Sequence, residues 1–197
     1  MKQFKNYKET QVISARPKIP AGGYEAVIKA AEVKEYSGKN GSYEMLEISF
    51  DITSGEYKDY YANDYRSQQS EDKKWKGVLR LNIPTDDGSD SDAWSKRKFK
   101  TNINSVEESN PGYSWDWDER KLKGKKVGVL LQNKEWDFNG KTGWTAQPYG
   151  FIDIQKIKDG NFTVPKDKPL QQSQQAQQAD SSTKSDFIEI EDDDLPF

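Results

Sequence analysis

The sequence predicts a mainly β domain with two helices, followed by a disordered acidic C-terminal tail. Several short segments alternate apolar and polar residues, the period of a half-buried strand, and two Asn-Gly pairs mark hairpin turns between them. After Pro165 the composition changes to a Gln- and Ser-rich run without periodicity. A chain of 197 residues has room for one domain plus such a tail.

Composition also indicates a folded part and a soluble appendage. Hydrophobic residues make up only 32%, but six Trp, ten Tyr and eight Phe are too many for an unfolded chain. Cys and His are absent, which excludes disulfides and most routes to zinc sites and to Ser-His or Cys-His catalysis.

The formal charge of −3 is divided unevenly along the chain. Residues 166–197 contain three lysines and eight acidic residues, a net charge of −5, so the remaining 165 residues, with 27 basic and 25 acidic groups, carry +2. A body of this charge can bind phosphate where its lysines gather on one face.

Targeting signals are not expected. The first residues, MKQFKNYKET, have no apolar region of a secretory signal, and no apolar run approaches the roughly 20 residues of a membrane span. We therefore expect a cytoplasmic protein with no membrane partner.

The domain is expected to begin with an irregular lead-in over residues 1–20, followed by a hairpin. Residues 24–34 mix β-branched and small apolar residues after a double glycine, which favours a strand, and residues 43–53 alternate clearly. The turn between them contains Asn40-Gly41.

A helix, a strand and a second helix are expected next. Tyr57, Tyr60, Tyr61 and Tyr65 have helical spacing and predict a helix over about 55–66, with Ser54 as its N-cap and with rings that pack rather than bind. Alternation over residues 78–83 predicts the third strand, and an apolar stripe predicts a helix over 93–108.

Residues 126–132 and 144–157 are expected to form the last two strands, with a second turn at Asn139-Gly140. The element order is then that of a five-stranded OB-fold-like barrel with the first helix as an insertion, and we assign this domain to residues 21–165. In that fold the first and last hairpin loops frame a nucleic-acid groove.

Each hairpin places aromatic residues and a lysine near a glycine-containing turn. Single-strand binding with little sequence preference uses this combination, because bases stack on aromatic rings at roughly 1–3 kcal/mol each while lysines meet phosphates. The competing interpretation is aromatic cross-strand pairs with solvated lysines. The candidates for DNA binding are Tyr36, Lys39, Tyr43, Trp136, Phe138, Lys141 and Trp144, together with Trp75 from the basic run 73–76 and Arg80 from the polar face of the third strand.

Acidic residues also crowd one loop, which raises a two-metal nuclease as an alternative. They are Asp86, Asp87, Asp90 and Asp92. Their spacing lacks the glycine that a calcium loop requires, and such loops are commonly solvated turns, so we expect no metal, no cofactor and no catalytic residue.

The tail divides into a linker over residues 166–185 and an acidic tip over 186–197. The tip ends in Asp192, Asp193, Asp194, Leu195, Pro196 and Phe197. A terminal phenyl ring and carboxylate suit a basic-rimmed apolar pocket on a partner protein, and the acids steer the encounter. A tail that only aids solubility would explain the aspartates but not the three apolar residues.

This ending resembles the acidic tip of bacterial single-stranded-DNA-binding proteins, whose pattern Asp-Asp-Asp-Ile-Pro-Phe differs here only at Leu195. The Gln-rich linker resembles theirs as well. Over about residues 20–165 the chain is similar to a family of small proteins from phages and prophages of Gram-positive bacteria. The similar stretches are GEYKDYY, KKWKGVLRLNIP, KRKFKT, SNPGYSWDW and LKGKKVGVLL.

The resemblance implies a non-enzymatic protein that coats single-stranded DNA during phage replication or recombination, in the bacterial host cytoplasm, and recruits host or phage enzymes. The partner-binding roles of the family carry over to Asp192, Asp193, Asp194, Pro196 and Phe197, whereas no DNA-contacting residue carries over. A protein adaptor without DNA affinity, a metal-dependent nuclease and a Trp-rich carbohydrate binder stay open as alternatives. So does a homo-oligomer, because one small barrel offers few binding subsites.

Overall fold

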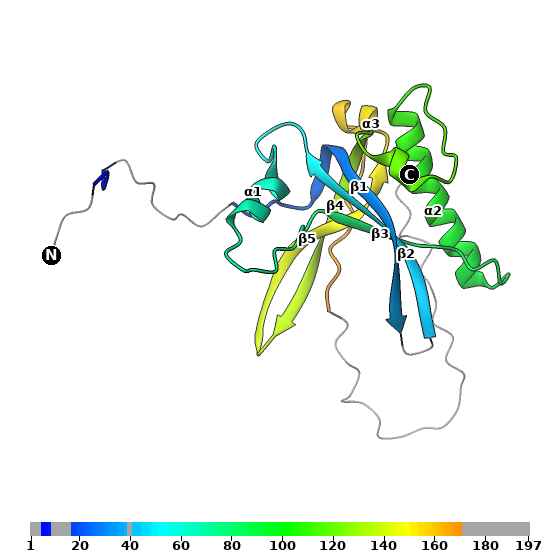
Figure 1. Ribbon diagram of the computed structural model, residues 1–197, viewed down its shortest axis with the longest axis horizontal. Coiled ribbons are helices and arrows are strands. Elements are labelled where there is room, and N and C mark those ends of the chain that lie inside the picture. The colour runs from blue at the N-terminus through cyan, green and yellow to red at the C-terminus, as the bar shows by residue number, and fades with distance from the viewer. Residues whose placement is uncertain (1–4, 9–16, 39–40, 171–197) are drawn as a thin grey trace, which may run out of the picture.

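In the computed structural model, which describes residues 5–8, 17–38 and 41–170, the chain forms one open antiparallel sheet with helices at both ends (Figure 1). The expected tip at 186–197 and most of the expected linker lie outside the described residues. In chain order the elements are β1 (Gly22–Gly38), β2 (Gly41–Ile52), α1 (Tyr60–Ser67), β3 (Val78–Asn82), α2 (Asp90–Ser109), the 3-10 helix η1 (Glu119–Leu122), β4 (Lys126–Phe138), β5 (Lys141–Ile152) and α3 (Ile154–Lys158).

The sheet has the strand order β3-β2-β1-β4-β5, and β1 is its longest strand. The first part of β1 pairs with β4, from Gly22 opposite Leu131 to Val27 opposite Lys126, while its outer part pairs with β2 alone. A bulge between Ile28 and Ala30 marks the change. The hairpins β1–β2 and β4–β5 therefore diverge from a shared base (Figure 1).

One face of the sheet carries the apolar core. Ile48, Phe50 and Val129 are fully buried there, together with Val106 of α2 and Leu122 of η1. Ile48, Phe50 and Val129 are apolar positions of alternating strand segments, so strand periodicity alone places these three on one side.

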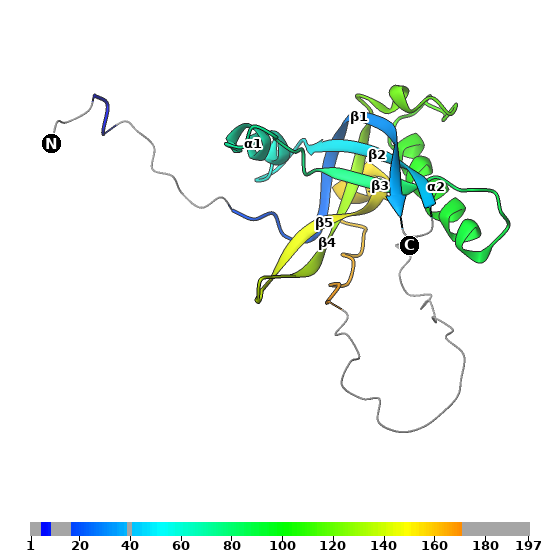
Figure 2. The same ribbon diagram turned by 60° about the horizontal axis from the view of Figure 1, so that its bottom comes forward.

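Helix α2 is joined to the end of β5 by buried hydrogen bonds. Asn102 Oδ1 accepts the backbone N–H of Phe151 at 2.6 Å, and the Ser105 hydroxyl donates to the Phe151 carbonyl at 3.2 Å. Figure 2 shows α2 and α1 at opposite ends of the sheet, so the two helices flank it.

The expected mainly β class is confirmed, with several differences in the elements. Residues 144–157, expected as one strand, are divided, because β5 ends at Ile152 and α3 begins at Ile154, where Asp153 caps the helix by accepting the N–H of Gln155. The chain thus has a third helix. The sheet is open, with β3 and β5 as its edges, although these two strands come close to each other.

Helix α1 begins at Tyr60, five residues later than expected, and Ser54 does not cap it. Its cap comes from β2, where the buried carboxylate of Asp51 accepts the backbone N–H groups of Tyr61 at 3.0 Å and Ala62 at 3.2 Å. As expected, three of the four tyrosines pack: Tyr61 is buried, and Tyr57 and Tyr60 pack against the core, whereas Tyr65 is 38% exposed.

The first residues of the expected linker lie along β4. Lys168 donates its N–H to the Asn133 carbonyl at 2.8 Å and accepts the N–H of Glu135 at 3.0 Å. The Asn133 side chain also donates to Asp167 at 2.9 Å. The chain therefore leaves the domain at Leu170, beside the outer half of β4.

Candidate functional site

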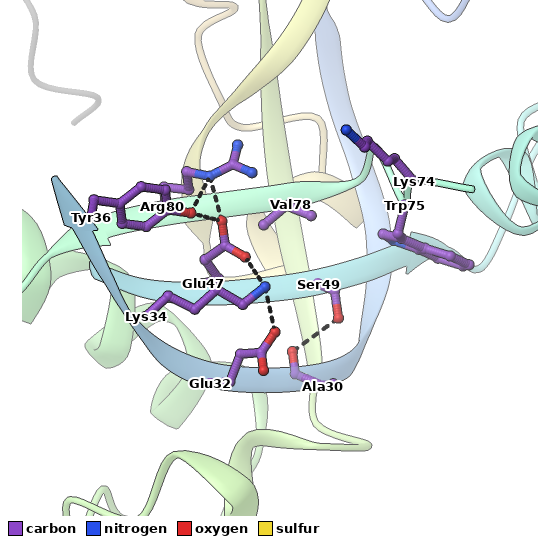
Figure 3. Close-up of a pocket in the computed structure, with 10 residues that line it drawn as sticks. All are labelled: Ala30, Glu32, Lys34, Tyr36, Glu47, Ser49, Lys74, Trp75, Val78 and Arg80. Carbon is purple, nitrogen blue, oxygen red and sulfur yellow. Dashed lines mark hydrogen bonds and ion pairs between the residues drawn. The ribbon is translucent and has the colours of Figure 1, made fainter. Parts of the chain in front are cut away.

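The polar face of β1, β2 and β3 forms a groove (Figure 3). Strand register brings its residues together, with Glu47 opposite both Glu32 and Arg80, and Ser49 opposite both Ala30 and Val78. The groove is lined by Ala30, Glu32, Lys34, Tyr36, Glu47, Ser49, Lys74, Trp75, Val78 and Arg80.

This groove continues into a second hollow that reaches the β4–β5 hairpin. Four residues, Lys74, Trp75, Val78 and Arg80, line both hollows. The second hollow extends to Tyr60 of α1 on one side and to Trp144, Ala146 and Pro148 of β5 on the other. A continuous concave surface therefore joins the two hairpins across β3.

The carboxylate of Glu47 is at the centre of the groove and binds three neighbours. One oxygen accepts from Arg80 Nε at 2.6 Å and from the Tyr36 hydroxyl, and the other accepts from Lys34 Nζ at 2.8 Å. Burial would raise the pKa of Glu47, but the hydrogen bonds from Lys34, Tyr36 and Arg80 outweigh it and lower the pKa to about 2. Glu47 is thus ionised at neutral pH.

The two tyrosines of the first hairpin form a stacked pair. Tyr36 and Tyr43 are directly opposite each other, with ring centroids 5.7 Å apart and planes 18° apart. Such a pair is a cross-strand contact, as the competing interpretation of the hairpin supposed. It also presents a flat aromatic surface beside the groove, because Tyr43 is exposed.

Trp75 has a fixed position between the two hollows. Its indole N–H donates to the Phe50 carbonyl at 3.0 Å, and its ring lies 5.9 Å from that of Tyr65. Lys74, the preceding residue, is highly exposed and pairs only loosely with Asp72 at 3.3 Å. A rigid aromatic ring beside a mobile cation suits a base and its phosphate.

The second hairpin divides its candidates between two faces. Trp136 pairs with Gly143 and Phe138 with Lys141, whereas Trp144 pairs with Glu135. Since directly opposed residues share a face and neighbours alternate, Trp136, Phe138 and Lys141 lie on one face and Trp144 on the other. Only Trp144 lines the hollow that contains Trp75 and Arg80.

The structure thus brings Tyr36, Trp75, Arg80 and Trp144 together, with Tyr43 beside them. It places Trp136, Phe138 and Lys141 away from them. Lys39 and the tip residues 192–197 lie outside the described residues. Lys34, Glu47 and Lys74 are not among the residues predicted from the sequence, although alternation along β1 and β2 puts Lys34 on the Tyr36 side and Glu47 on the polar face.

The acidic loop before α2 uses its carboxylates internally. Asp92 accepts the N–H groups of Thr85 and Asp86, both at 3.0 Å, and pairs with Lys96 at 2.8 Å. Within residues 5–8, 17–38 and 41–170, no three acidic side chains gather as a metal-ligand set. Nor does that part of the chain contain a helix with the length and apolarity needed to cross a membrane.

A comparison with models of protein families found no match to this chain, and neither did a comparison with curated protein sequences.

Proposed function

We propose that this protein binds single-stranded DNA with little sequence specificity, in the groove between its two hairpins, and that it is not an enzyme. The observation that supports this most is the continuous concave surface, which collects Tyr36, Trp75, Arg80 and Trp144 from four separate segments. Aromatic rings interleaved with cations along an open groove suit stacked bases linked by phosphates.

The strand arrangement supports the same proposal. We infer that the open sheet is an OB-fold variant, because α2 joins β3 to β4 and the edge strands β3 and β5 approach each other. In OB-folds, oligonucleotides bind on the face of strands 2 and 3, between the loop of the first hairpin and that of the last. The groove described here is lined by residues of β1, β2 and β3, which supports this correspondence.

The tip extends this function to protein partners. We propose that Asp192, Asp193, Asp194, Leu195, Pro196 and Phe197 recruit host or phage replication and recombination proteins to the coated strand. Their resemblance to the bacterial tip supports this role, and we propose that the protein acts in the cytoplasm of a bacterial host during phage DNA metabolism. A homo-oligomer would add binding subsites along one DNA strand.

Binding is tested by titrating the intact protein with oligo(dT) and with a duplex of equal length, while following Trp fluorescence. We expect saturable quenching by oligo(dT) only, because unstacked bases are needed to reach Trp75 and Trp144. On a log–log plot the affinity should fall with salt, with a slope of roughly −0.7 for each phosphate neutralised.

A pair of arginine variants tests the site. Arg80→Gln should weaken binding and reduce the salt slope by about 0.7, because one phosphate contact is lost. Arg120→Gln is the matched control, since Arg120 is on η1 and bound to Asp118 at 2.8 Å. Absence of any oligo(dT) binding would contradict the proposal and favour a protein adaptor that acts through the tip.

A further inference from the structure

Glu47 is an unexpected residue at the centre of a groove for a polyanion, because its charge repels phosphate. Its side chain is only 9% exposed, and it lies between β1 and β3 with donors on both sides. Buried charges are costly unless they are paired, so the carboxylate needs the partners that surround it. The presence of this carboxylate in the proposed binding groove therefore needs a physical explanation.

Its contact with Arg80 orients the guanidinium. Of the guanidinium nitrogens of Arg80, only Nε donates to Glu47, at 2.6 Å. The two terminal amino groups point away from the carboxylate (Figure 3). A guanidinium is a rigid fork, so fixing Nε also fixes the direction of the terminal N–H groups. Because the side chain is 51% exposed, these groups can donate to a phosphate or a base edge.

Its contact with Tyr36 orients an aromatic ring. The Tyr36 hydroxyl donates to the same oxygen that Arg80 uses, and the ring stacks on Tyr43 with planes 18° apart. The ring is therefore held at its hydroxyl and at one face. Arg80 Nε also donates to the Tyr36 hydroxyl at 3.4 Å, so without the Glu47 acceptor the ring would keep only this longer contact and its stacking on Tyr43.

We propose that Glu47 is the positioning residue of the groove: one buried carboxylate oxygen holds the Tyr36 ring and the Arg80 guanidinium in the arrangement that binds a nucleotide. The proposal rests on the proposed function, which it deepens by assigning a role to an acid within the site. It predicts that loss of this acceptor weakens DNA binding, although removal of the negative charge alone would favour binding.

Two substitutions of nearly equal size separate position from charge. Glu47→Gln keeps the shared acceptor oxygen, whereas Glu47→Met keeps the volume without an acceptor, and both remove the charge. Glu47→Met should weaken oligo(dT) binding about fivefold to tenfold, the loss expected for one or two hydrogen bonds, while Glu47→Gln stays within about twofold of the natural protein.

Glu108→Gln is the matched control outside the groove. Glu108 is exposed on α2 and, among the described residues, accepts only from Asn104, at 2.8 Å, so this substitution removes the same charge without touching Tyr36 or Arg80. It should leave binding unchanged or slightly tighter. If Glu47→Met also bound as tightly as the natural protein, or more tightly, the positioning role would be refuted.

A measurement without DNA keeps this inference separate from the proposed function. In NMR spectra of the folded protein, the Arg80 Nε–H should exchange slowly with solvent in the natural protein and in Glu47→Gln, and fast in Glu47→Met. Slow exchange in all three would refute the positioning role. Failure of the natural protein to bind oligo(dT) would refute the proposed function, while the exchange rates would still decide whether Glu47 holds Arg80.

Discussion

Trp136 and Trp144 lie on opposite faces of the second hairpin. They are similarly exposed, at 38% and 42%, and come from the same two strands. Only Trp144 shares a hollow with Trp75 and Arg80. Exposure alone therefore does not distinguish the two candidates, whereas strand register does.

Trp144→Ala should weaken oligo(dT) binding about tenfold, because one stacked base contributes roughly 1–3 kcal/mol. Trp136→Ala should change the affinity less than about twofold, since its ring packs over Gly143 on the opposite face. Fluorescence titration of both variants measures this. Equal losses would mean that DNA wraps around the hairpin rather than following the groove.

Glu47 should also make stability depend on pH in a defined window. Its folded pKa, about 2, is below the ordinary value of 4.5, so its ion pairs stabilise the protein fully above about pH 4.5. As the pH falls from about 4.5 to 2, the carboxylate becomes protonated and this contribution is lost.

Urea unfolding of the natural protein and of Glu47→Gln, over a pH series, tests this linkage. The natural protein should be the more stable at pH 6, and the difference between the two should shrink towards pH 2. A difference that stays constant across the series would show that Glu47 has no depressed pKa.

At the scale of elements, the start of α1 depends on a carboxylate from another strand. Asp51→Ala would leave the N–H groups of Tyr61 and Ala62 without their acceptor, and should lower the free energy of unfolding by about 1–3 kcal/mol. Thermal or urea unfolding measures the loss. DNA binding should weaken as well, because Tyr60 and Tyr61 line the second hollow.

Ser54→Ala is the control for this prediction. Ser54 precedes the tyrosines and has a good capping side chain, but its hydroxyl donates to Glu25 at 3.1 Å on the surface. We expect a change of less than about 0.5 kcal/mol, as for most surface substitutions. A loss as large as that of Asp51→Ala would mean that Ser54 is the real cap.

These elements also show how much of the fold and of the candidate site could be predicted from the sequence. A two-residue turn at Asn139-Gly140 pairs residue 138 with 141 and 136 with 143, so the opposite faces of Trp136 and Trp144 follow from turn length and strand alternation. Strand alternation likewise predicts which strand residues face the core, and that Lys34 lies on the same face of β1 as Tyr36. Asp51 at the start of α1 could not be predicted in this way, because the contact depends on how β2 and α1 pack in three dimensions.

The end of β5 was missed for a local reason. The segment 144–157 reads as one apolar run, but Asp153 accepts the N–H of Gln155 and starts α3. Asp is a favoured helix cap, so this signal was present in the sequence. The groove as a whole could not be predicted from the sequence, because it combines residues of β1, β2, β3 and β5 with the segment before β3.

At the scale of the whole molecule, the acidic tail begins beside the groove. The chain leaves the domain at Leu170, next to β4, and residues 171–197 carry most of the negative charge of the C-terminal region. A random coil of 27 residues spans roughly 25–30 Å on average. We therefore propose that the acidic residues of the tip compete with phosphates for the proposed groove.

Deletion of residues 186–197 should tighten oligo(dT) binding at low salt and have little effect at high salt. The reason is screening, since the Debye length falls from about 30 Å at 0.01 M to about 8 Å at 0.15 M salt. Affinities of the full and shortened chains, measured over a salt series, test this. Equal affinities at low salt would show that the tail does not compete.

The central claim is that single-stranded DNA lies in the groove between the hairpins, and photo-crosslinking tests it most directly. Oligo(dT) containing 5-iodouracil would be irradiated with the intact protein, and the linked residues identified by mass spectrometry. We predict crosslinks at Tyr36, Tyr43, Trp75 and Trp144. Crosslinks confined to Trp117, which is 79% exposed on the loop after α2, or no crosslinks at all, would contradict the claim.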